Sequence, residues 1–288
     1  MPERVALADG ASLALVRAGD PAAPVTVVLL HSYAQDHRVW HKVVDLLGQA
    51  DPTVRVIAYD HRGHGDSTPA EPATATMEQL GDDLAELLAQ TDGRLVLVGH
   101  GMGGHVALAA IARHEPKRVA GLVLLSTSTG LVAETSAALP RSVGRLVQDL
   151  HAILGPRIVG QVRQRIDKAT TAGLRWLLLG DDPDPDDVRL VAEMIARHWP
   201  DTAALFHPAL DRYDRAAALA VTVDTPVLAI VGERDRLVPA AHASALVSGN
   251  RRGHAVTLPG RGHMLPLEAA AQIVPRILGL VGDILRDG

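Results

Sequence analysis

Residues Gly99–Gly104 read Gly-His-Gly-Met-Gly-Gly, and they carry the strongest single indication of the fold. They follow the apolar run Leu95–Val98 and open Gly104–His114, in which apolar residues recur at helical spacing. A glycine-rich turn that joins a strand directly to a helix is the context of a nucleophile elbow, G-x-S-x-G. In this chain the central position of that turn is Gly101, which has no side chain to act as a nucleophile.

Short apolar runs with the length of buried strands are found along most of the chain. The six clearest are Val25–His31, Arg55–Asp60, Leu95–His100, Val119–Ser126, Val227–Gly232 and His254–Pro259. Helical spacing lies between them in Trp40–Ala50, Met77–Gln90 and Gly104–His114. Strands that alternate with crossover helices predict an α/β fold, a doubly wound and mostly parallel sheet. Glu3–Gly19 alternates around Asp9-Gly10 and is expected to add an antiparallel hairpin at the sheet edge.

The alternation of strands and helices breaks once, between residues 131 and 213, where the pattern is almost wholly helical. The acidic run Asp181–Asp187 predicts an internal turn there. Ligands bind at the carboxyl ends of strands in open α/β sheets, so a helical insertion at that edge predicts a lid. We therefore expect a core domain of residues 1–130 and 214–288, and a helical cap of residues 131–213.

Composition excludes several classes of protein. The chain has 288 residues, 47% of them hydrophobic, which is enough for a full core and rules out disorder. The net charge of −5 offers no basic surface, so we expect no nucleic-acid partner. The absence of cysteine excludes disulfides and thiolate chemistry. No apolar run reaches a membrane span and no signal peptide is evident, so a cytoplasmic protein is expected, of unpredicted oligomeric state.

Five segments of this chain, in order and spacing, resemble the α/β-hydrolase fold superfamily along nearly the whole length. They are His31–Trp40 (HSYAQDHRVW), Asp60–Ser67 (DHRGHGDS), Gly99–Gly104 (GHGMGG), Gly232–Pro239 (GERDRLVP) and Pro259–Glu268 (PGRGHMLPLE). The resemblance implies an α/β-hydrolase fold with a cap, and a Ser–Asp–His triad in that chain order.

Two members of the implied triad are present. Asp235 follows a predicted strand where the family keeps its acid, and His263 follows the last strand where the family keeps its base. The carboxylate would fix the tautomer of the imidazole and stabilise the imidazolium. Gly101 stands at the nucleophile position, so no acyl-enzyme can form there, while glycine tolerates the strained backbone of an elbow.

The oxyanion loop also departs from the family, which usually has His-Gly where this chain has His31-Ser32. The resemblance implies the backbone N–H groups of Tyr33 and Met102 as oxyanion donors. Ser32 adds a hydroxyl, as in the plant hydroxynitrile lyases, and this hydroxyl either binds a substrate oxygen or caps the loop. Ser32 could replace the missing nucleophile only if it lay within hydrogen-bond reach of His263.

Other polar residues carry weaker signals. His100 beside the elbow is expected to contact substrate or to pack behind the site. His61 and His64 lie where the family has a tight loop, and no further ligand cluster accompanies them, so we expect neither a metal nor an organic cofactor. The loop before Trp40 is similar to that of cofactor-free ring-opening dioxygenases, but Ser126–Thr129 lacks their acid.

Three functions remain open at this point. The chain could be an acyl hydrolase inactivated at Gly101, a non-covalent general-base enzyme, or a binding protein that retains the pocket. The general-base enzyme could act on an ester, thioester or lactone, or could be a lyase, cyclase or cofactor-free dioxygenase. The complete motifs around Asp235 and His263 argue against the binding protein. We expect an enzyme that acts on a small, largely apolar carbonyl or acyl substrate, with His263 as base.

Overall fold

The computed structural model describes residues 2–115, 117–129, 168–198, 201–213, 219–220 and 222–287. Among them, an eight-stranded sheet has the order β1-β2-β4-β3-β5-β6-β7-β8. The strands are β1 Glu3–Ala6, β2 Ser12–Ala18, β3 Val25–Leu30, β4 Arg55–Tyr59, β5 Arg94–His100, β6 Val119–Leu125, β7 Val227–Gly232 and β8 Gly253–Leu258. Only β1–β2 and β2–β4 pair antiparallel, which confirms the mostly parallel sheet and the edge hairpin.

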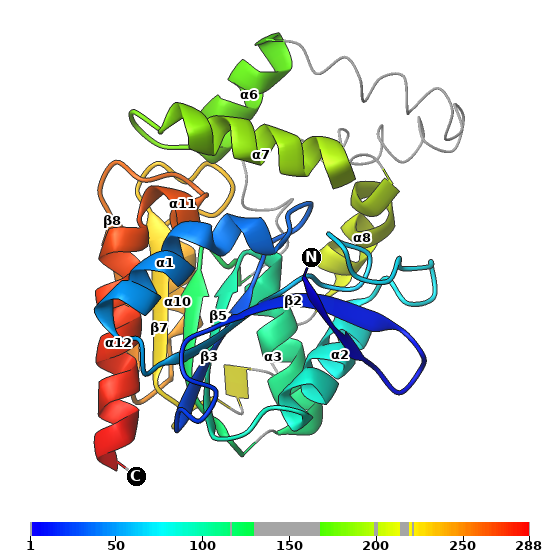
Figure 1. Ribbon diagram of the computed structural model, residues 1–288. Helices are drawn as coiled ribbons and strands as arrows, with labels where there is room; N and C mark the ends of the chain where they lie inside the picture. The colour runs from blue at the N-terminus through cyan, green and yellow to red at the C-terminus, as the bar shows by residue number, and fades with distance from the viewer. Residues whose placement is uncertain are drawn as a thin grey trace.

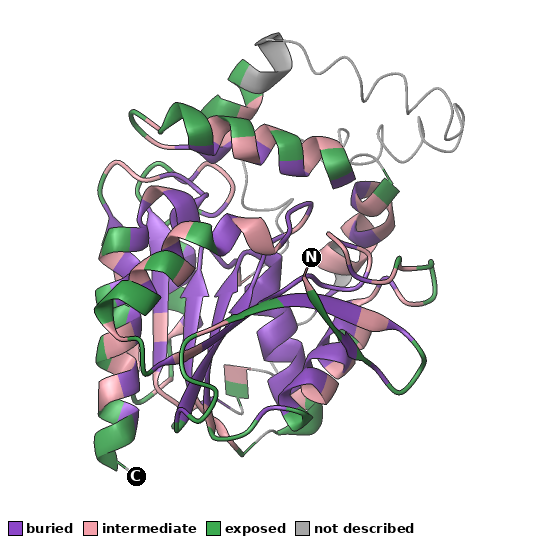
Figure 2. Ribbon diagram, viewed as in Figure 1, coloured by how far each residue is buried: buried purple, intermediate pink, exposed green. Residues whose placement is uncertain are grey.

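Helices cover both faces of the sheet (Figure 1). They are α1 His41–Ala50 and α12 Ala270–Asp287 on one face, and α2 Met77–Ala89 and α3 Met102–His114 on the other. Alternate residues of β3 explain this, since Val27 and Leu29 pack toward α1 and α12 whereas Val28 and Leu30 pack toward α2 and α3. Strand β3 is therefore buried throughout, and its neighbours β5 and β6 are buried except at their first residues (Figure 2). None of the described helices is both long and apolar enough to cross a membrane.

Of the described helices of the predicted cap, the first two lie above the carboxyl ends of the strands and the third lies beside them (Figure 1). These helices are α6 Lys168–Leu178, α7 Pro185–His198 and α8 Asp201–Arg212. The predicted acidic turn lies between α6 and α7, although it is shorter than expected because Pro185 already begins α7. Residues 131–167 of the predicted cap lie outside the described residues, so the division into core and cap stays a prediction.

The parallel strands bring distant parts of the chain to one edge of the sheet. Because β3, β5, β7 and β8 all point the same way, the loops that follow them meet there. These loops carry Ser32, Gly101, Asp235 and His263. The shared direction of these strands therefore brings the residues of the candidate site together, beneath α6 and α7.

Candidate active site

The turn between β5 and α3 has the backbone of a nucleophile elbow. Gly101 has φ +51° and ψ −114°, a conformation that favours glycine, and its N–H donates to the Leu125 carbonyl oxygen at 2.9 Å. A Cβ added to Gly101 would lie 2.2 Å from Ser32 Oγ and 3.6 Å from His263 Nε2. The place of the absent side chain is therefore flanked by the Ser32 hydroxyl and the His263 ring.

Asp235 and His263 form a buried, hydrogen-bonded pair. Asp235 Oδ2 lies 3.0 Å from His263 Nδ1, and Asp235 Oδ1 accepts the backbone N–H groups of Leu237 and Val238 at 2.9 and 2.8 Å. These bonds fix the carboxylate, which in turn orients the ring so that Nε2 faces the elbow.

Burial and charge act in opposite directions on this pair. Burial lowers the pKa of His263, but the Asp235 carboxylate more than offsets this effect, and the pKa lies above its ordinary value. Burial likewise raises the pKa of Asp235, yet the His263 ring and the Val238 N–H keep it below its ordinary value. The pair is therefore suited to hold a proton on the imidazole while the carboxylate stays ionised.

Ser32 connects the oxyanion loop to the elbow. Its hydroxyl accepts the Met102 N–H at 3.3 Å, and its own N–H donates to Gln35 Oε1 at 3.3 Å. Met102, whose N–H was predicted as an oxyanion donor, therefore already contacts the Ser32 hydroxyl. Tyr33 also borders the cavity, and its phenol donates to the Ala203 carbonyl oxygen at 2.5 Å, which links the loop to α8.

A cavity of about 250 Å³ opens above these residues, and its lining is largely apolar. Its floor includes Ser32, Gly101, Met102 and His263. Aliphatic side chains of the cap helices line it from above: Leu174, Leu177, Leu178, Ile195 and Leu210. Such a cavity suits a small, mainly apolar ligand with one polar group near the floor.

The sequence did not identify the contacts from the cap or those at the far side of the cavity. The spacing of Leu174, Leu177 and Leu178 (i, i+3, i+4) is a signal that could have marked one face of α6 as cavity lining. His105 and Ser128 also line the cavity, and His105 Nε2 lies 3.0 Å from the Ser128 carbonyl oxygen. Neither of these two has a motif of its own.

His100 occupies the second of the two positions predicted for it. It is fully buried, is not among the residues that line the cavity, and packs behind His263 with ring centroids 5.0 Å apart. Its Nε2 lies 2.9 Å from the His263 carbonyl oxygen. Burial lowers the pKa of His100 to about 3, so the ring is neutral and supports the His263 backbone.

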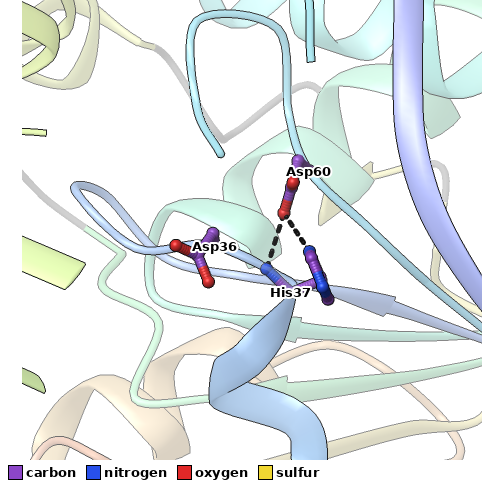
Figure 3. A group of neighbouring side chains, drawn as sticks. All are labelled: Asp36, His37 and Asp60. Atoms are coloured by element: carbon purple, nitrogen blue, oxygen red, sulfur yellow. Dashed lines mark hydrogen bonds and ion pairs between the residues drawn. The ribbon is translucent and has the colours of Figure 1, made fainter. Parts of the chain in front are cut away.

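Asp36, His37 and Asp60 bring candidate metal-ligand atoms close together (Figure 3). Asp60 Oδ1, however, accepts the His37 N–H at 2.6 Å and lies 2.8 Å from His37 Nδ1. Asp36 forms a two-point ion pair with Arg38, with both bonds at 2.8 Å. Because these ligand atoms are engaged within the protein, the cluster fits a structural junction between the loops after β3 and β4 better than a metal site.

Comparison with known proteins gives the family. Residues 25–270 match the α/β hydrolase fold family. A pimeloyl-[acyl-carrier protein] methyl ester esterase of Neisseria meningitidis serogroup C is 31% identical over 226 residues, 76% of this chain and 78% of the relative. Lipase LipV of Mycobacterium tuberculosis is 33% identical over 177 residues, 61% of this chain and 60% of that lipase.

Solved structures with the same fold cover 98–99% of this chain. An esterase from Exiguobacterium antarcticum superposes with a TM-score of 0.80 at 16% identity, covering 98% of this chain and 100% of that one. A thermophilic esterase from Thermogutta terrifontis gives a TM-score of 0.76 at 24% identity, covering 99% of both chains. The family match, together with the elbow and the buried Asp–His pair, shows that this chain belongs to the α/β hydrolase fold family and is an enzyme of that family.

Proposed function

We propose that this enzyme hydrolyses a small, largely apolar ester, thioester or lactone, with His263 as general base and no covalent intermediate at residue 101. The observation that carries the proposal is the Asp235–His263 pair, whose Nε2 faces the place of the missing nucleophile above an apolar cavity. The relatives named as lipase and methyl ester esterase support an ester bond as the target.

The reaction begins with a water molecule at His263 Nε2. Asp235 holds the proton of Nδ1, which leaves Nε2 free to accept the proton of the water as its oxygen bonds to the substrate carbonyl carbon. The resulting imidazolium, stabilised by Asp235, then protonates the leaving oxygen or sulfur as its bond to carbon breaks. Positioned proton transfer of this kind contributes about 10²–10⁴-fold to the rate.

The charge that develops on the carbonyl oxygen needs donors. We assign this role to the backbone N–H of Tyr33 and to the Ser32 hydroxyl. The Met102 N–H, the second donor of the expected oxyanion hole, acts through Ser32, because it donates to the Ser32 hydroxyl oxygen. Ser32 accepts the Met102 N–H and keeps its own proton for the substrate oxygen. A single oxyanion donor is worth about 10²–10³-fold in kcat, so together they would supply a large part of the catalysis.

Packing at the elbow indicates that Gly101 and Ser32 fit each other as a pair. It therefore favours a glycine that is natural to this enzyme over a serine hydrolase that has been inactivated at residue 101. The Ser32 hydroxyl lies where a side chain on Gly101 would begin, and a serine there would force it to move. Substrate size would be limited by the cavity of about 250 Å³ and by cap residues such as Leu177 and Ile195. We also retain the proposed division into a core of residues 1–130 and 214–288 and a cap of residues 131–213.

The proposal is tested on a panel of chromogenic short-chain esters, thioesters and lactones. We compare the unmodified enzyme with His263→Ala and with His254→Ala, which removes an exposed histidine of β8 and serves as the matched control. The proposal requires a rate that falls about 10²–10⁴-fold in His263→Ala and is kept in His254→Ala. If no member of the panel is cleaved faster by the unmodified enzyme than by His263→Ala, the hydrolase proposal is wrong.

A further inference from the structure

One carboxylate holds the loop that carries His263 on both sides of that residue. Glu268, the last residue of α11 (Leu265–Glu268), accepts the backbone N–H of Gly262 at 3.0 Å through Oε2 and that of Met264 at 3.0 Å through Oε1. Its Oε2 also accepts the N–H of Gly180 at 2.7 Å. Gly180 belongs to the connection between α6 and α7, so the same carboxylate joins the His263 loop to the cap.

Further backbone bonds reinforce this junction. The N–H of His263 donates to the Leu178 carbonyl oxygen at 2.8 Å, and the N–H of Asp181 donates to the Gly260 carbonyl oxygen at 2.8 Å. Gly180 and Gly262 touch backbone to backbone, since a Cβ on Gly262 would lie 2.5 Å from Gly180 N. Residues 178–181 of the cap and residues 260–264 of the core therefore form one connected unit.

The cap side of this unit also borders the cavity. Leu177 and Leu178, at the end of α6, line the space above Gly101 and His263. A ligand that packs against these two side chains therefore contacts the segment whose backbone is bonded to the His263 loop. Burial raises the pKa of Glu268 above its ordinary value, although the three N–H groups that its carboxylate accepts act in the opposite direction.

We propose that Glu268 is a positioning residue that couples the cap segment 178–181 to the catalytic histidine. Through this coupling, a ligand bound beneath the cap sets the position of the His263 ring. The proposal rests on the proposed function for the role of His263 as base. The physical coupling itself is carried by the bonds from Glu268 to Gly180, Gly262 and Met264.

The test replaces Glu268 by glutamine, whose carboxamide has one acceptor oxygen and turns an N–H₂ group toward N–H donors. Glu233→Gln is the matched control, because Glu233 accepts the Gly260 N–H at 3.0 Å in the same loop, whereas the hydrogen bonds to Gly262 and Met264 among the described residues come from Glu268. Amide hydrogen exchange reports on Gly180 and on the residues flanking His263, and NMR titration reports the pKa of the His263 ring. Neither measurement requires turnover.

We expect Glu268→Gln to lower the protection of the Gly180, Gly262 and Met264 amides together, by at least about tenfold. The pKa of the His263 ring should fall, because the Glu268 charge is among the causes that raise it. Glu233→Gln should leave all of these unchanged. If Glu268→Gln unfolds, Glu268→Asp keeps the charge on a shorter side chain and should show the same pattern in weaker form.

Two results would overturn the proposal. In the first, protection falls evenly over the whole chain and the His263 ring titrates as before, which is a loss of stability alone. In the second, the amides beside His263 loosen while Gly180 stays protected, which means that the cap is not coupled through Glu268. A failure of ester hydrolysis would leave both readouts intact, so the two proposals fail separately.

Discussion

The hydroxyl oxygen of Ser32 lies 2.2 Å from the point at which a side chain on Gly101 would place its Cβ atom. A carbon atom and an oxygen atom that are not bonded to each other do not approach so closely. A side chain on Gly101 therefore requires the Ser32 side chain to move. The Ser32 hydroxyl, in the loop after β3, thus occupies the space that a serine side chain at position 101, after β5, would need. It also accepts the Met102 N–H, which lies in the first turn of α3.

Gly101→Ser alone is expected to give little acyl-enzyme, because the new serine side chain clashes with the Ser32 hydroxyl and must displace it. Gly101→Ser combined with Ser32→Gly removes the clash and should restore a serine beside His263 Nε2, with a burst of product equal to the enzyme concentration. Pre-steady-state kinetics with a chromogenic ester measures both variants. A full burst from Gly101→Ser alone would show that Ser32 is not in the way.

Ser32→Ala removes the proposed hydroxyl donor but leaves the backbone of the loop in place. We expect kcat to fall about 10²-fold, in line with the loss of one oxyanion donor, and KM to change little. Ser128→Ala is the control, since Ser128 also lines the cavity but lies in the loop after β6, which ends at Leu125. Equal effects of the two substitutions on kcat would remove Ser32 from the proposed oxyanion hole.

The rate should depend on pH through His263, which must be neutral to accept a proton. Because Asp235 raises the pKa of His263 above its ordinary value of 6.5, activity should be lost as pH falls through that raised value. Asp235→Asn removes the charge while burial remains, so the acid limb of the profile should move below pH 6.5 and kcat should fall about 10³–10⁴-fold. An acid limb that stays in place in Asp235→Asn would exclude His263 as the titrating group.

Stability should decrease in mild acid, because several histidines are buried in neutral form. Burial, with the charges of neighbouring histidines, holds the pKa values of His31 and His64 well below 6.5, and burial lowers that of His61 to about 4. His31 Nε2 accepts the His61 N–H at 3.0 Å, a bond that a protonated ring would lose.

The sign follows from proton binding. Below pH 6.5 the unfolded chain takes up protons at these histidines that the folded chain does not, so the free energy of unfolding falls as pH is lowered. The slope reaches up to about 1.4 kcal/mol per pH unit for each histidine. The raised pKa of His263 opposes this loss mainly above pH 6.5, where the folded chain takes up a proton at His263 before the unfolded chain does. Urea unfolding between pH 7.5 and pH 5 measures it, and a flat profile would contradict the assignment of neutral buried rings.

Much of this architecture could be predicted because it depends on regular patterns. Continuous apolar runs such as Val25–Leu30 are typical of strands buried on both faces, and parallel strands necessarily bring Gly101, Asp235 and His263 to one edge. The elbow could be predicted for the same reason, since its glycines and its position between a strand and a helix leave few other conformations.

The remaining features depend on contacts that no pattern encodes. The bonds between residues 178–181 and residues 260–264 are made by backbone atoms, which look the same in every sequence. Glu268 lies within Pro259–Glu268, one of the segments that resemble the family. Only the structure reveals that its carboxylate reaches Gly180, which is distant in sequence. The side-chain orientation of Ser32 could not be predicted either, because it depends on the space left by Gly101.

Direct attack by water is tested most directly by the intact mass of the enzyme, quenched while it turns over an ester of the panel. The unmodified enzyme is compared with the double variant Gly101→Ser/Ser32→Gly. We expect turnover with no added mass on the unmodified enzyme, whereas the double variant should gain one acyl group on the new serine. An acyl group found on the unmodified enzyme, at Ser32 or elsewhere, would contradict direct attack by water with His263 as base.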